Sequence, residues 1–136
     1  MKRMLVMLIA GAVLVTLTEV TVHGAISEKG ATYIIPIKGP VEKGLLYVVR
    51  RGLTQAQTEK AGAVIFHMHT LGGSVKVTED IVRMMIDLPA NVHTYTLVDK
   101  DAISAGAMIA LSTEDIYMTP GSRIGASAVV TLFGDL

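Results

Sequence analysis

The sequence contains no cysteine and no tryptophan, and aromatic residues make up only 4% of its 136 residues. Without cysteine the chain has no disulfide, no catalytic thiolate and no zinc–thiolate site. The scarcity of aromatic side chains argues against a surface that stacks on nucleic-acid bases. Twelve basic residues balance twelve acidic ones, so no net charge attracts nucleic acid or an anionic membrane. We therefore expect no nucleic-acid partner.

The first 25 residues have the pattern of an export signal. Lys2 and Arg3 precede an uninterrupted apolar run over residues 4–15, and small residues follow around Gly24 and Ala25. The run is shorter than the roughly 20 residues that a membrane-spanning helix needs. The sequence predicts a signal peptide or an N-terminal membrane-targeting segment over residues 1–25, with a buried N-terminal helix as the alternative.

From residue 31 onward, short β-branched runs alternate with amphipathic helical patterns. The predicted strands are 32–37, 63–69, 92–98 and 116–118, and the predicted helices are 41–60, 74–88 and 104–111. Strands that alternate with helices indicate right-handed crossovers and therefore an α/β domain with a parallel sheet. Strand 63–69 is almost continuously apolar, which is typical of a sheet covered on both faces. Pro36 places the first strand at an edge, and residues 99–101 are predicted to form a loop.

The domain is predicted to span residues 26–136. The chain ends at Leu136 without a closing helix or strand pattern. We therefore expect the domain to be incomplete at its C-terminus.

Two loops at the carboxyl ends of predicted strands carry the candidate chemistry, because ligands of open α/β sheets gather at that edge. The first is Thr70-Leu71-Gly72-Gly73-Ser74, whose glycines permit backbone conformations closed to other residues. Taken alone, it is also an ordinary entry into a helix. The second is Ile103-Ser104-Ala105-Gly106-Ala107. Ser104 is either a helix N-cap, which this segment alone favours, or a nucleophile whose developing oxyanion the next N–H stabilises.

Other polar side chains offer weaker candidates. His67 and His69 are two residues apart in a strand, so they point to one face and could bind a metal or act as a base. No third ligand is evident, and we expect neutral histidines that face a covering helix or solvent. Lys100 precedes Ser104 by four residues, but its charge is satisfied within an Asp-Lys-Asp segment. We expect neither a metal nor a cofactor.

The order of these pieces resembles the Clp-protease/crotonase superfamily, and most closely the membrane-bound serine peptidases of the NfeD type, the stomatin operon partners. The resemblance covers residues 33–130. It rests on the Gly-Gly turn, on Ala-Ile-Ser-Ala-Gly-Ala at 102–107 and on Pro-Gly-Ser-Arg-Ile-Gly-Ala at 120–126. It implies a fold of stacked β-β-α turns, with a parallel sheet, covering helices and assembly into a homo-oligomer.

The resemblance also implies roles for particular residues. Ser104 is the expected nucleophile, and the N–H groups of Gly73 and Ala105 are the expected oxyanion hole. The base of NfeD-type peptidases is a lysine about forty residues after the serine, which places it beyond Leu136. The histidine of Clp proteases aligns near Ser127, so this chain alone is expected to be inactive. Leu71 stands where the family has a proline, and the turn loses some rigidity there.

The implied function is cleavage of hydrophobic segments in membrane-protein or peptide substrates, with a stomatin-type protein as partner, on the extracytoplasmic side of a membrane. Two alternatives stay open. One is a non-catalytic scaffold or interaction module of the same fold for a stomatin-type membrane protein. The other is a crotonase-type acyl-CoA enzyme, which the export signal disfavours.

Overall fold

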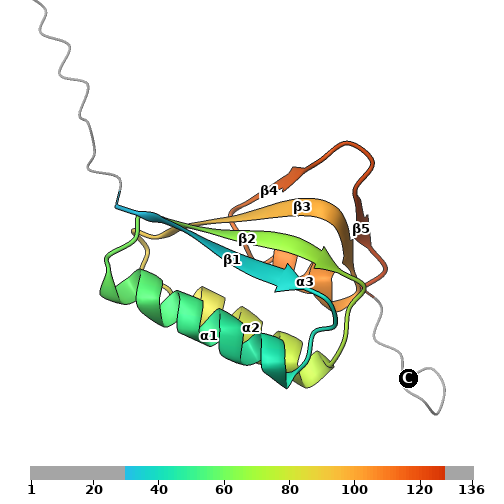
Figure 1. Ribbon diagram of the computed structural model, residues 1–136, viewed down its shortest axis with the longest axis horizontal. Coiled ribbons are helices and arrows are strands. Elements are labelled where there is room, and N and C mark those ends of the chain that lie inside the picture. Colours follow the sequence, from blue (N-terminus) through green and yellow to red (C-terminus); the bar gives the residue numbers. More distant parts are fainter. Residues whose placement is uncertain (1–29, 128–136) are drawn as a thin grey trace, which may run out of the picture.

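The structure is a computed structural model that describes residues 30–127 (Figure 1). The predicted targeting segment over residues 1–25 lies outside the described residues. The strands are β1 (Thr32–Lys38), β2 (Ala63–Thr70), β3 (His93–Ile103), β4 (Asp115–Met118) and β5 (Arg123–Gly125). The helices are α1 (Lys43–Thr58), α2 (Val75–Ile86) and α3 (Ala105–Ala110). None of them is long and apolar enough to cross a bilayer.

The strands form one parallel sheet in the order β1-β2-β3-β4, and β5 pairs with the carboxyl end of β3. The predicted α/β domain with a parallel sheet is therefore confirmed. β1 lies at an edge, as Pro36 predicts. The carboxyl ends of β2 and β3 lie side by side, because Thr70 pairs with Ala102. This register brings the two candidate loops to the same edge of the sheet.

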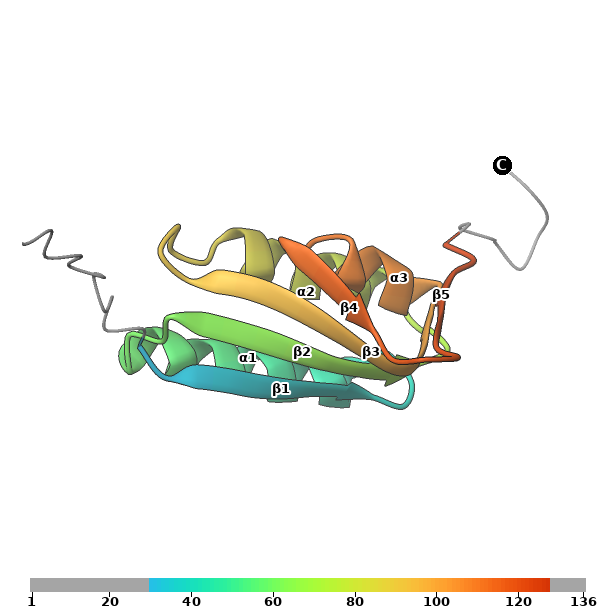
Figure 2. The same ribbon diagram turned by 90° about the horizontal axis from the view of Figure 1, so that it is seen from above.

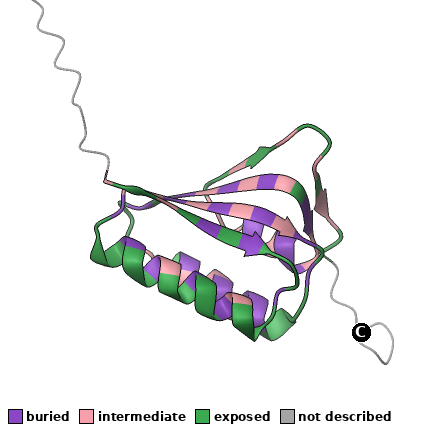
Figure 3. Ribbon diagram, viewed as in Figure 1, coloured by how far each residue is buried: buried purple, intermediate pink, exposed green. Residues whose placement is uncertain are grey.

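All three helices lie on one face of the sheet (Figures 1 and 2). Side chains of β2 therefore alternate between a buried and a half-buried face (Figure 3). Buried beneath the helices are Val64, Phe66, Met68 and Thr70. The opposite face carries Ala63, Ile65, His67 and His69. Within residues 30–127, cover on both faces is a wrong prediction, because a continuous apolar run does not reveal which face the helices occupy.

The helices pack through the stripes that their sequence periodicity predicts, with small shifts. α1 buries Leu46, Val49, Leu53 and Ala56, which recur at the three-to-four spacing of an amphipathic helix. α2 begins at its N-cap Ser74, whose hydroxyl accepts the N–H of Val77 at 3.4 Å. It buries Val77, Thr78, Ile81 and Met85. Both helices end two residues earlier than predicted, and helix ends are where periodicity is least informative.

The largest difference from the sequence prediction concerns β3, which continues to Ile103 and does not end at Val98. Residues 99–101 are therefore strand and not loop. The cause is β5, a strand of 3 residues that the sequence pattern does not predict and that pairs Arg123 with Asp101. This pairing buries Asp101 to 8% exposure, although its neighbours Asp99 and Lys100 had suggested a solvated loop.

Candidate active site

The Gly-Gly turn and Ser104 are in direct contact. Gly72 has φ +110, and a Cβ built on it would lie 2.9 Å from the Cβ and 3.3 Å from the Oγ of Ser104. Such a separation is too short for two carbon atoms, and a positive φ is itself unfavourable for a residue with a side chain. Only glycine therefore allows the turn to approach the serine this closely.

Ser104 has a backbone conformation that few residues other than glycine adopt, with φ 54 and ψ −113. Its N–H donates to the carbonyl of Gly125 at 2.8 Å, and its own carbonyl accepts the N–H of Met108 at 3.2 Å. Its hydroxyl makes no capping hydrogen bond to α3. Ser104 therefore occupies the N-cap position of α3, as this segment predicts, but its side chain does not cap the helix. Strained residues of this kind persist where surrounding contacts hold them, and they cluster at functional sites.

Two backbone N–H groups beside Ser104 have no acceptor. Within residues 30–127, the N–H groups of Gly73 and Ala105 donate no hydrogen bond. The turn that carries the first of them is fixed by Val41, whose N–H donates to Gly72 at 2.9 Å and whose carbonyl accepts from Ser74 at 2.8 Å. Any side chain at Gly73 would collide with the backbone of Val41. The Gly73 N–H is therefore held in a fixed position.

The buried side chain of Thr70 stabilises the turn through hydrogen bonds. The sequence pattern did not identify Thr70 as a candidate. Thr70 is 2% exposed. Its hydroxyl donates to the carbonyl of Gly39 at 2.6 Å and accepts the N–H of Gly72 at 3.1 Å. Gly106 lets α3 pack against it, because a Cβ there would collide with the Thr70 methyl group. The available signal was a hydroxyl-bearing residue two positions before the first glycine, since such side chains commonly bond to nearby backbone in turns.

The two histidines lie on the open face of the sheet, as their spacing predicts, and each faces an aspartate of β3. His67 Nε2 lies 3.5 Å from Asp99 Oδ2, and His69 Nδ1 lies 3.7 Å from Asp101 Oδ2. No group of three or more His, Cys, Asp or Glu residues in the described part of the chain is arranged to hold a metal ion. The histidines are therefore paired with carboxylates rather than assembled as ligands.

A cavity of about 450 Å³ adjoins the turn. Its lining is Gly39, Pro40, His69, Thr70, Leu71, Gly72 and Asp101. Leu71, in the place of the family's proline, is 69% exposed. Lys100 is exposed on β3, and Ser127, near which the Clp-type histidine aligns, is exposed at the end of the described residues.

The fold matches that of Clp-protease-like domains. The 1510-N membrane-bound stomatin-specific protease, solved as a Lys-to-Ala mutant with a substrate peptide, aligns at a TM-score of 0.68 and 28% identity, over 79% of this chain and 51% of that one. A 1510-N structure described as specific for a stomatin homolog from Pyrococcus horikoshii aligns at 0.64 and 31%, over 72% and 50%. ClpP1 from Listeria monocytogenes shares the fold, at 0.60 and 20%, over 68% and 55%.

Residues 31–136 match the family described as NfeD1b, N-terminal domain, and the chain belongs to this family. Membrane protein NfeD1b of Bacillus subtilis (strain 168) is 39% identical over 104 residues, which are 76% of this chain and 23% of that protein. Membrane-bound protease PH1510 of Pyrococcus horikoshii is 32% identical over 100 residues, 72% of this chain and 22% of that protein. The predicted NfeD type and Clp-like fold are thus confirmed. The chain spans less than a quarter of the length of these two relatives.

Proposed function

We propose that this protein is a membrane-associated serine endopeptidase of the NfeD/Clp-like class, with Ser104 as its nucleophile. The conformation of Ser104 is the observation that carries the proposal. It has φ 54, its hydroxyl caps no helix, and it lies against Gly72 at the carboxyl edge of the sheet. Its relatives include a membrane-bound protease. Strained residues cluster at functional sites, and among the described residues the Ser104 hydroxyl makes no hydrogen bond to α3 that would compete with a base.

The reaction would be acyl transfer. The Ser104 oxygen attacks the scissile carbonyl, and the N–H groups of Gly73 and Ala105 donate to the oxygen on which negative charge develops. The leaving amine takes a proton, and water then hydrolyses the ester that remains on Ser104. The base would be a desolvated lysine of lowered pKa beyond Leu136, about forty residues after the serine.

Hydrophobic segments of membrane proteins are the proposed substrates. The cavity beside Gly72 presents Pro40 and the exposed Leu71 to a bound chain. The related 1510-N structure is described with a substrate peptide and as stomatin-specific. We extend this to a stomatin-type partner for the present protein. In this proposal residues 1–25 target the protein, and residues 26–136 are part of a homo-oligomeric peptidase domain. That domain lies on the extracytoplasmic side of the membrane.

A fluorophosphonate probe, applied to the product of the complete open reading frame, tests this function. Labelling should be present in the wild type and abolished in Ser104→Ala, since removal of a nucleophile eliminates nearly all acyl transfer. Ser112→Ala is the matched control, because the Ser112 hydroxyl donates to the Ile109 carbonyl at 2.7 Å and lies at the other end of α3. Labelling that survives in Ser104→Ala contradicts the proposal. A wild type that is not labelled but binds a stomatin-type protein favours the scaffold alternative.

A further inference from the structure

The conformation of Ser104 depends on a very short strand. Its N–H donates to the carbonyl of Gly125 at 2.8 Å, and Gly125 ends β5, which is 3 residues long. Among the described residues, β5 pairs only with the end of β3, from Asp101 opposite Arg123 to Ile103 opposite Gly125. A strand this short gains little from its own backbone bonds. The position of the Gly125 carbonyl therefore depends on whatever else fixes β5.

The ion pair between Arg123 and Asp101 is one contact that holds β5 in place. Arg123 places Nε at 2.8 Å and Nη2 at 2.6 Å from the same oxygen, Oδ1, of Asp101. The hydrogen bond from Nε and the close approach of Nη2 together restrict the direction of the guanidinium as well as its distance. The Asp101 side chain is 12% exposed, whereas that of Arg123 is 71% exposed. The aspartate is thus a buried anchor to which β5 attaches from the surface.

The other oxygen of Asp101 faces the neighbouring strand β2. Oδ2 lies 3.7 Å from Nδ1 of His69. This nitrogen is buried and has no hydrogen-bond partner among the described residues. The carboxylate therefore lies between β2 and β5 while its own backbone belongs to β3. One of its oxygens faces His69 of β2, and the other accepts the hydrogen bond from Arg123 of β5.

We propose that Asp101 is a positioning residue for Ser104. By holding Arg123 it fixes β5, β5 places the Gly125 carbonyl on the Ser104 N–H, and that bond keeps Ser104 at its positive φ. In this scheme Asp101 and Arg123 act through the backbone of Ser104, although Asp101 also lines the cavity beside Gly72. The inference rests on the proposed function only for its consequence in catalysis, because the backbone coupling itself is independent of any reaction.

Amide hydrogen exchange of the full chain, isotope-labelled and followed by NMR, directly measures the coupling between the Arg123–Asp101 ion pair and the Ser104 N–H. In Arg123→Met and in Asp101→Asn, the Ser104 amide should exchange at least about tenfold faster, while the Val98 amide within β3 keeps its rate. The Ser104 Cα and Cβ chemical shifts should move toward those of ordinary backbone. Arg123→Lys, which keeps the charge and loses the fork, should restore part of the protection.

The matched control is the pair of Lys76 and Asp80, 2.7 Å apart on α2. Lys76→Met and Asp80→Asn remove the same charges without touching β5, and they should leave the Ser104 amide unchanged. The proposal is overturned if the Ser104 amide keeps its protection in Arg123→Met and Asp101→Asn. It is equally overturned if every amide of β3 loses protection together, since that reports general destabilisation.

The consequence in catalysis is a separate measurement on the product of the complete open reading frame. Asp101→Asn and Arg123→Met should each slow fluorophosphonate labelling by about tenfold or more, because a displaced nucleophile reacts poorly. If the wild type is not labelled, the proposed function fails while the exchange data still decide the coupling. If the wild type is labelled and the exchange of Ser104 is unchanged in the variants, the function stands and the positioning role fails.

Discussion

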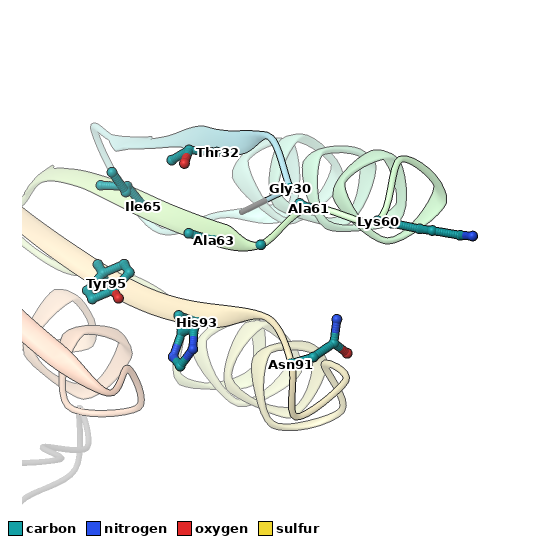
Figure 4. A pocket seen from close by; sticks show the side chains of 10 residues that line it. Gly30, Thr32, Lys60, Ala61, Ala63, Ile65, Asn91, His93 and Tyr95 are labelled. Atoms are coloured by element: carbon teal, nitrogen blue, oxygen red, sulfur yellow. The ribbon is translucent and has the colours of Figure 1, made fainter. Parts of the chain in front are cut away.

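The amino and carboxyl edges of the sheet differ in the size of their cavities and in the backbone features beside them. The amino edge carries the larger hollow of the two, about 900 Å³, with Gly30, Asn91, His93 and Tyr95 in its lining (Figure 4). The cavity beside Gly72 at the carboxyl edge has about half that volume, 450 Å³. Yet the strained serine, the close glycine contact and two N–H groups that have no acceptor within residues 30–127 are at the carboxyl edge. Volume alone would have pointed to the amino edge, away from this candidate site.

Polar groups at the amino edge are paired or point into solvent. His93 Nδ1 lies 2.9 Å from Glu114 Oε2, and the Lys60 side chain projects away from the strands (Figure 4). Lys60 also has a positive φ of 53. It directly follows α1, where the Ala61 N–H bonds back to the Ala56 carbonyl at 2.8 Å, and helices commonly end with such a residue. Positive φ is therefore informative at Ser104, which begins a helix, and ordinary at Lys60, which follows one.

The largest effect that separates the edges is expected from Gly72→Ala. The new Cβ would displace Ser104 and should reduce fluorophosphonate labelling by about a hundredfold or more. Gly121→Ala is the control, since Gly121 has a similar φ of +81 but nothing within 4 Å of an added Cβ. Both variants should lose about 1–2 kcal/mol of stability through backbone strain. Equal labelling in the two variants would show that the contact with Ser104 is not what matters.

A smaller effect is expected from the two buried threonines, one near each edge. Thr70→Val leaves the Gly39 carbonyl and the Gly72 N–H without their partner and should cost about 1–3 kcal/mol of unfolding free energy. Thr94→Val should cost less than about 1 kcal/mol, because the Glu114 N–H that bonds to its hydroxyl also donates to the Thr94 carbonyl. Denaturant titration measures both changes. A larger loss of unfolding free energy for Thr94→Val than for Thr70→Val would contradict this expected difference between the two edges.

The smallest effect concerns pH and the amino edge alone. The hydrogen bond from Tyr33, with a further one from Gln55, holds the pKa of Glu59 below its ordinary value of 4.5. Because the folded state favours the ionised form, this stabilisation is present above pH 4.5 and is lost as the pH falls through the lowered pKa. Tyr33→Phe should therefore weaken the acid dependence of the unfolding free energy, whereas Tyr47→Phe, on the exposed side of α1, should not. Labelling of Ser104 should be unchanged in both, and a loss of labelling in Tyr33→Phe would mean that the two edges are coupled.

Periodicity predicted most of the scaffold, because the stripes of α1 and α2 and the apolar runs of β1 and β2 are local patterns. It failed at β3, where the acidic segment around Asp101 suggested a loop. Burial of that aspartate needs Arg123, which lies 22 residues further along the chain. A local pattern contains no information about such a partner, so the end of β3 and the whole of β5 could not be predicted.

The candidate site divides in the same way. By itself, the sequence determined that a Gly-Gly turn and a serine followed by small residues come after two successive strands, and that these pieces belong to a Clp-like order. Only the tertiary structure decided that the Ser104 hydroxyl does not cap α3. The φ of Ser104, its bond to Gly125 and its contact with Gly72 all depend on strands that are distant in sequence, since backbone strain is stable only where neighbours hold it.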